Sequence, residues 1–137
     1  MNYKIKKISG DASFREFYRI KKGLKSSIIV KANKEKQRNL IHYIIINKVL
    51  NENKINAPKL INNYFENSMI EISDLGEKSF YNFIISKKNK LSYYKKLIKL
   101  IIKLQKIKVR NVYKIGKYKL KFEKYTKKNL HKESDLF

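Results

Sequence analysis

The chain contains no cysteine, so neither a disulfide bond nor a thiolate metal site can form. It has only two histidines, His42 and His131, which argues against a histidine-rich metal site. No apolar run approaches the roughly 18–20 residues that cross a bilayer, and the first residues lack the apolar core of a signal peptide. Together these absences favour a cytoplasmic protein of one domain.

Acidic residues are also scarce, since 11 Asp and Glu stand against 34 Lys and Arg, a net charge of +23. A protein this basic can bind nucleic acid or an anionic membrane surface. However, the charge is nearly all lysine, spread over the whole length, whereas specific phosphate and base contacts favour the arginine fork. Lys, Asn and Ile enriched together indicate the codon bias of an AT-rich genome. We therefore interpret most of the charge as background, with a functional basic surface as the alternative.

Alternating and aromatic-rich patterns over residues 3–8, 14–20 and 26–32 predict a three-stranded antiparallel meander, with a turn at Lys22-Gly23. The first two strands flank a polar turn at residues 9–15. This turn holds one glycine, one small residue and one hydroxyl, and it can bring backbone N–H groups close to an anion. On its own, the stretch favours an ordinary hairpin turn.

A helix is predicted over residues 35–53, where apolar residues recur at helical spacing and Asn33 can serve as the N-cap. Pro58 then starts an extended segment, because the residue before a proline disfavours helix. Two further strands are predicted over residues 59–65 and 68–72.

The second half of the chain has a mainly helical pattern. Ser79 can cap a short helix over residues 80–86, and the clearest helix spans residues 91–107, with an apolar stripe opposite lysines. A basic amphipathic helix can lie on a membrane, but we favour a helix that faces a core. Tyrosine, leucine and phenylalanine over residues 118–125 indicate a short extended piece or the approach to another helix.

The predicted order is therefore three strands, a helix, two strands, a break and more helices. This order predicts an α+β fold in which a five-stranded antiparallel sheet and one helix form a protein-kinase-like small lobe. The small lobe, with the nucleotide-binding loop, is expected over residues 1–75. Residues 76–137 then form the hinge and the first helices of an incomplete large lobe.

Four segments resemble the aminoglycoside phosphotransferase superfamily of the protein-kinase-like fold. Within it, they are most similar to the bacterial kinases that phosphorylate the cell-wall sugars N-acetylmuramate and N-acetylglucosamine. The similar segments are residues 8–15 with 17–19 ("sGDASFRrYfR"), 55–60 ("v-x-a-P-x-i"), 70–76 ("lLlEDLG", with Ser73 for the usual glutamate) and 130–137 ("L-x-x-E-x-x-L-F").

The resemblance implies a role for three groups of residues. It places Lys31 where a kinase-like third strand carries its phosphate-pairing lysine, for which the following helix offers only Glu35 and Glu52 as partners. The backbone donors that cover the ATP phosphates would be those of Gly10, Asp11, Ala12, Ser13 and Phe14. The backbone that hydrogen-bonds the adenine would be that of Ile72, Ser73, Asp74 and Leu75.

Phosphoryl transfer in this fold requires a catalytic Asp in an H-G-D loop, an Asn shortly after it and another Asp for Mg²⁺. The sequence holds no such loop, because His131-Lys132-Glu133 lacks the Gly-Asp. We therefore expect the nucleotide-binding half of a kinase, with no catalytic residue and no metal ligand of its own, inactive by itself.

The expected partners are ATP or GTP with Mg²⁺, whose ligands lie in the missing lobe, and a sugar or amino-sugar acceptor. No specific nucleic acid and no membrane span are expected, and the exposed helix at residues 91–107 is expected to favour self-association. Two alternatives remain open: a basic module that binds nucleic acid or a membrane surface, and a remnant without activity.

Overall fold

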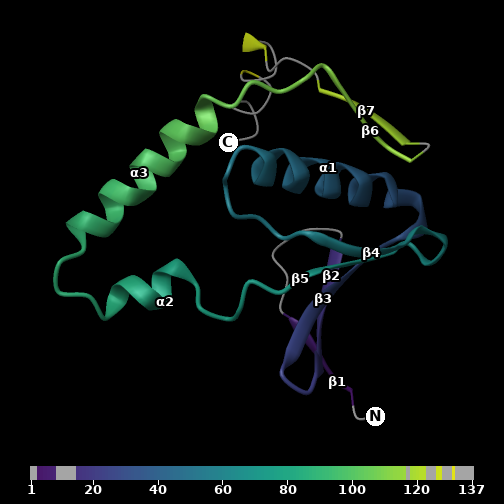
Figure 1. Ribbon diagram of the computed structural model, residues 1–137, viewed down its shortest axis with the longest axis horizontal. Helices are drawn as coiled ribbons and strands as arrows, with labels where there is room; N and C mark the ends of the chain where they lie inside the picture. Colours follow the sequence, from purple (N-terminus) through teal and green to yellow (C-terminus); the bar gives the residue numbers. More distant parts are fainter. Residues whose placement is uncertain (1–2, 9–14, 117, 123–125, 128–130, 132–137) are drawn as a thin grey trace.

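The computed structural model describes residues 3–8, 15–116, 118–122, 126–127 and 131 (Figure 1). They form an α+β fold with a five-stranded antiparallel sheet, three α-helices and a β-hairpin. The elements are β1 (Lys4–Ile8), β2 (Arg15–Lys22), β3 (Lys25–Ala32), η1 (Lys34–Lys36), α1 (Arg38–Glu52), β4 (Leu60–Tyr64), η2 (Phe65–Asn67), β5 (Met69–Ser73), α2 (Phe80–Ile85), α3 (Leu91–Gln105), β6 (Val112–Ile115) and β7 (Tyr118–Lys121).

The strand order in the sheet is β1-β2-β3-β5-β4, and every pairing is antiparallel. The chain leaves the sheet after β3 to form α1 and returns as the edge strand β4. The β3–β5 register places Ile28 opposite Ile72 and Val30 opposite Ile70, so the apolar side chains of both central strands meet on one face. The predicted antiparallel sheet with one helix inserted after its third strand is confirmed.

Helix α1 lies between the sheet and the hairpin β6–β7 and buries a different stripe against each (Figure 1). Leu40 and Ile44 pack on the inner face of the sheet, with Val30 and Ile70. The other stripe packs on the aromatic and aliphatic side chains of the hairpin. Its members are Ile41, Ile45 and Val49. A helix that is apolar on two faces in this way belongs in a core rather than on a surface.

The end of α1 turns the chain back toward the sheet. The Ile55 N–H donates to the Leu50 carbonyl at 2.9 Å, and the Lys54 N–H donates to the Asn51 carbonyl at 3.0 Å. This pair of bonds is the Schellman arrangement, in which the residue after the cap takes a left-handed backbone, here Lys54 with φ 57°. The extended segment through Pro58 follows directly and leads into β4.

Three sequence predictions are corrected at the boundaries. Helix α1 begins at Arg38, three residues later than predicted, because residues 34–36 form a 3-10 turn, and the Asn33 side chain makes no cap hydrogen bond. Helix α3 ends at Gln105 rather than at residue 107. The extended piece expected beyond it is the second strand of a hairpin, and its partner β6 was not predicted.

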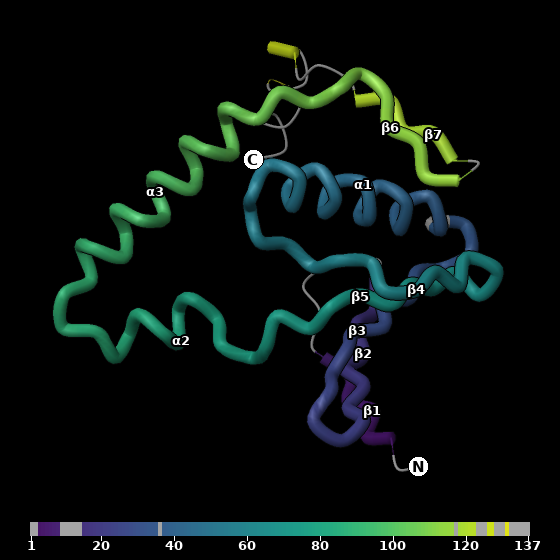
Figure 2. Tube along the Cα trace, in the orientation of Figure 1, coloured from purple at the N-terminus to yellow at the C-terminus, as the bar shows by residue number. Residues whose placement is uncertain are grey.

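Helix α2 leads the chain away from the sheet, and α3 runs back toward the end of α1, where Lys103 Nζ donates to the Lys54 carbonyl at 2.8 Å (Figure 2). No residue of α3 is buried, so within the described residues its apolar stripe does not face a core, and the expectation that this helix is exposed is confirmed. Among the described residues, no helix has both the length and the apolar character needed to cross a membrane.

Two neighbouring isoleucines of α1 test the packing of this helix. Ile45 is fully buried against the hairpin, whereas Ile46 is 45% exposed. We expect Ile45→Ala to lower the free energy of unfolding by about 2–5 kcal/mol, through lost burial and the cavity that remains. Ile46→Ala should change it by less than about 0.5 kcal/mol. Urea unfolding followed by circular dichroism measures both, and equal effects would contradict the assigned faces.

Candidate functional site

A cleft of about 480 Å³ opens on the inner face of the sheet, on the side that faces α1. Its walls come from the first three strands, from α1 and from the segment that follows β5. Apolar and aromatic side chains supply most of the lining, and these are Ile8, Phe17, Ile28, Tyr43, Pro58 and Ile72. Such a flat apolar space suits a planar ring system with polar edges.

The predicted hinge residues Ile72, Ser73, Asp74 and Leu75 all line this cleft. Within the described part of the chain, the backbone N–H and C=O groups of Asp74 and Leu75 form no hydrogen bond. Leu75 is exposed, so its backbone groups can pair with water or with a ligand in the cleft.

The phosphate-covering residues predicted at 10–14 lie outside the described residues. The strands on either side of them are described, and their register places Ile8 opposite Phe17, with both side chains in the cleft. The Arg15 guanidinium lies 5.0 Å from the centre of the Tyr43 ring on α1. Strand β2 and helix α1 therefore meet beside the cleft through a cation–π contact.

Arg19 of β2 binds the segment after β5 through a buried ion pair. Its Nε donates to Asp74 Oδ2 at 2.7 Å and its Nη2 donates to Asp74 Oδ1 at 3.0 Å, while the two side chains are 8% and 6% exposed. Nη1 donates to Glu77 Oε1. A guanidinium fork on a carboxylate is the geometry for which arginine is better suited than lysine.

The same arginine also fixes the turn at Gly76. Arg19 Nη2 donates to the Gly76 carbonyl at 3.0 Å, and the Gly76 N–H donates to Asp74 Oδ1 at 2.8 Å. Gly76 has φ +95°, a left-handed backbone that favours glycine. The turn that ends the hinge is thus held by hydrogen bonds from both sides.

The Arg19 hydrogen bonds lower the pKa of Asp74 from 3.8 to about 2, helped by the Gly76 N–H and opposed by burial. Asp74 is therefore ionised at neutral pH and its oxygens are occupied. It is a structural carboxylate rather than a proton acceptor or a metal ligand.

Lys31 lies on the other face of the sheet from this cleft. In β3 the buried residues Ile28, Val30 and Ala32 face α1, so exposed Lys31 points to the opposite side. It stands opposite Glu16 of β2 in the strand register. The pairing with a glutamate of the following helix, considered for Glu35 and Glu52, is not formed, and Glu52 lies 3.9 Å from Lys48 instead.

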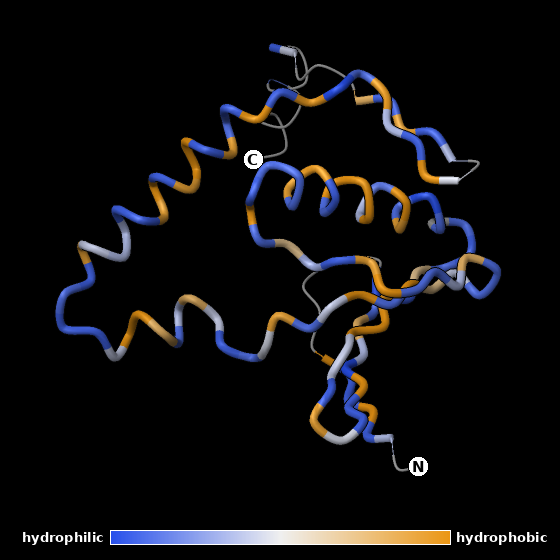
Figure 3. The backbone as a smooth tube through the Cα atoms, in the orientation of Figure 1, coloured by the Kyte–Doolittle hydropathy of each residue, from blue (hydrophilic) through white to orange (hydrophobic). Residues whose placement is uncertain are grey.

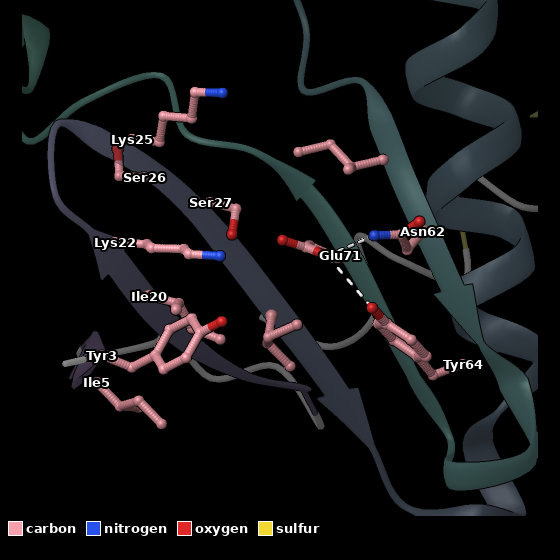
Figure 4. Close-up of a pocket in the computed structure, with 12 residues that line it drawn as sticks. Tyr3, Ile5, Ile20, Lys22, Lys25, Ser26, Ser27, Asn62, Tyr64 and Glu71 are labelled. Atoms are coloured by element: carbon pink, nitrogen blue, oxygen red, sulfur yellow. Dashed lines mark hydrogen bonds between the residues drawn. The ribbon is translucent and has the colours of Figure 1, made fainter. Parts of the chain in front are cut away.

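A larger hollow of about 850 Å³ lies on that outer face, around Glu71 (Figure 4). Glu71 Oε2 accepts hydrogen bonds from Asn62 Nδ2 at 2.8 Å and from the Tyr64 hydroxyl at 3.4 Å. Bonds from Ser27 first, and then from Asn62, lower the Glu71 pKa. None of the predicted site residues lines this hollow.

Two further observations concern what the site could bind and which proteins the chain is similar to. No group of three or more His, Cys, Asp or Glu within the described residues could hold a metal ion. Comparisons with protein-family models, with curated proteins and with solved structures return no match.

Arg19 is the residue of this site that the sequence analysis did not assign. The available signal was compositional, because arginine occurs at only four positions of a lysine-rich chain. At Arg19 the fork geometry on Asp74 explains why an arginine rather than a lysine is suited to the position.

The Arg19–Asp74 pair predicts a specific acid dependence of stability. Because the folded pKa of Asp74 is lowered, its contribution is full above about pH 4 and is lost as the pH falls toward 2. At neutral pH we expect Asp74→Asn to lower the free energy of unfolding by about 1–2 kcal/mol. This deficit should shrink between pH 4 and pH 2.

Urea unfolding at a series of pH values measures this difference. Glu66 is exposed and lies away from the ion pair, so it provides the control. Glu66→Gln should have little effect on how the free energy of unfolding falls at acid pH. A deficit for Asp74→Asn that stays constant from neutral pH to pH 2 would contradict the assignment.

Proposed function

We propose that the cleft holds the purine of a nucleoside triphosphate, and that the chain is the nucleotide-binding half of a small-molecule kinase. The acceptor class would be a sugar or amino-sugar hydroxyl, as the resemblance to cell-wall amino-sugar kinases implies. One observation carries the proposal: the four residues assigned to the hinge from sequence line one apolar cleft, together with Ile8 and Phe17.

The fold agrees with this proposal in its order of elements. Three strands, a helix and two strands form one antiparallel sheet, with the helix on one face. The cleft lies on that same face and is bordered by the ends of β1 and β5. The predicted phosphate-covering residues connect Ile8 to Arg15, and Ile8 itself lines the cleft.

The chemistry of the lining suits a base rather than a sugar. Ile8, Phe17 and Ile72 offer apolar surface from the sheet for one face of a planar ring. The backbone of Asp74 and Leu75 offers donors and acceptors for its edge. Arg19 neutralises Asp74, so that carboxylate does not repel a triphosphate as an isolated charge would.

Because the sequence holds no H-G-D catalytic loop, nucleotide binding should occur without phosphoryl transfer. We expect the purified chain to bind Mg-ATP but not to transfer phosphate to N-acetylmuramate or N-acetylglucosamine. Release of ADP in the presence of either sugar is the measurement. Turnover above that of a sample without the chain would contradict this expectation.

Two isoleucines of β1 test the cleft itself. Ile8 lines it, whereas Ile5 lies on the opposite face of the strand and is 67% exposed. We expect Mg-ATP to raise the melting temperature of the wild type, since a ligand that binds only the folded state stabilises it. Ile8→Asn should weaken ATP binding by about tenfold or more through the loss of apolar contact with the base. Ile5→Asn should leave it unchanged.

Isothermal titration calorimetry on both variants provides the binding constants, and circular dichroism shows that each remains folded. If Mg-ATP neither raises the melting temperature of the wild type nor gives a measurable binding constant, the proposal is wrong. Equal weakening by Ile5→Asn would show that ATP binds outside this cleft.

A further inference from the structure

Helix α3 carries a continuous apolar face that the described protein does not cover. Figure 3 shows apolar and polar positions alternating along its turns. No residue of the helix is buried, and seven of its large apolar side chains are between 39% and 64% exposed. These seven are Leu91, Tyr94, Ile98, Leu100, Ile101, Ile102 and Leu104.

The polar face of α3 is uniformly basic. At 100° per residue, the apolar positions share a broad arc and the lysines occupy the opposite one. Between Leu91 and Gln105 there are four lysines and no acidic residue, so the polar face has no charge of opposite sign. These lysines are Lys95, Lys96, Lys99 and Lys103.

The charge asymmetry extends well beyond the helix. Residues 78–122 contain 15 Lys and Arg and not one Asp or Glu. A second copy of the helix would cover the apolar arc but would bring only more positive charge, so the lysines on the opposite arc would stay without a counter-charge. The charge instead matches a surface that is itself anionic.

A helix of 15 residues is marginal in water by itself, and α3 has few tertiary contacts, chiefly two pairs of aromatic rings with α2 and a hydrogen bond from Lys103 to the Lys54 carbonyl. Here the lysines at positions 95, 99 and 103 are also spaced at i, i+4, where like charges repel. The helix therefore gains most from a partner that covers the apolar arc and neutralises the lysines at once. An anionic bilayer surface provides both, an apolar layer beneath a layer of phosphate groups.

We propose that α3 is an interfacial helix that binds this protein to the surface of an anionic lipid bilayer. The helix lies in the plane of the surface, with its apolar arc at the boundary between headgroups and acyl chains. Its lysines reach the phosphate level along their own aliphatic stems.

Aromatic contacts extend the same surface from α3 to α2. The rings of Phe83 and Tyr93 lie 5.1 Å apart, and those of Phe80 and Tyr94 lie 6.2 Å apart. Tyrosine rings of this kind are favoured at the level of the headgroups, because one end is apolar and the other is polar. This surface is separate from the nucleotide cleft. The inference requires that the apolar arc of α3 stays uncovered in the whole protein, so a large lobe found packed on α3 would overturn it.

Co-sedimentation of the full chain with vesicles tests the proposal. We expect binding to vesicles of phosphatidylcholine mixed with phosphatidylglycerol, and little binding to phosphatidylcholine alone. Two lysines near an anionic surface each contribute about 1 kcal/mol, so Lys95→Gln with Lys99→Gln should weaken partitioning about thirtyfold. Matched changes at the exposed sheet-side lysines, Lys25→Gln with Lys34→Gln, should have a smaller effect.

The apolar arc is tested separately by Ile98→Asn with Ile101→Asn. Loss of two buried side chains should weaken partitioning by about tenfold or more. The control pair, Ile5→Asn with Ile61→Asn, removes similarly exposed isoleucines from the sheet and should leave partitioning unchanged. Because α3 contributes no buried residue, urea unfolding of the sheet should be the same in all these variants.

Several results would overturn the proposal. These are the absence of vesicle binding, equal binding to neutral and anionic vesicles, and equal losses in the sheet controls. Association of the free chain that Ile98→Asn with Ile101→Asn abolishes, without vesicle binding, would assign the apolar arc to a second copy instead. A gain in helical circular dichroism on addition of anionic vesicles, absent in that double variant, would support the proposal.

Discussion

The buried ion pair between Arg19 and Asp74 is the interaction on which the geometry of the candidate site depends. It joins residues that are 55 positions apart, on β2 and on the segment after β5, by two hydrogen bonds from one guanidinium. Neither charge could be buried without the other, because an isolated ion in a low-dielectric site is strongly disfavoured. The direction in which the chain leaves the sheet, through Leu75 and Gly76, follows from this pair. The cleft exists because that exit lies beside the apolar ends of β1 and β2.

Scarcity of acidic residues makes the position of each one informative. Four of them, Glu16, Glu71, Asp74 and Glu77, lie on or directly after the sheet and accept hydrogen bonds from described residues. None occurs in residues 78–122, which include α3 and the whole β6–β7 hairpin. The first region therefore has internal charge compensation, and the second depends on whatever surrounds it. A net charge of +23 averages over these two regions and conceals the difference between them.

Periodicity was sufficient for the sheet and for α1, because each element has a clear apolar pattern and a turn or proline at its end. It failed where the decisive contact is remote in sequence. The hairpin strand β6 has only four residues with a lysine inside it, so its strand character appears only when β7 and α1 cover it. Lys31 lies on the predicted strand, but successive side chains of a strand point to opposite faces. Its neighbours Val30 and Ala32 are buried, so Lys31 points to the outer face. The fork from Arg19 to Asp74 had no local signal apart from the rarity of arginine.

Stability is unevenly distributed along this chain, and that distribution links the two proposals. Leu40, Ile45, Val30 and Ile70 are fully buried, and all of them belong to the sheet and α1. The cleft proposed for a nucleotide takes Ile28, Ile72 and Tyr43 of its lining from the sheet and α1, and a site that holds a planar base is best built on such elements. Helix α3 has no buried residue and few internal contacts, so an external surface that covers its apolar arc would offset much of the conformational entropy that its helicity costs. Folding of α3 should therefore be coupled to the binding of that surface, while the sheet and the cleft stay the same in either state.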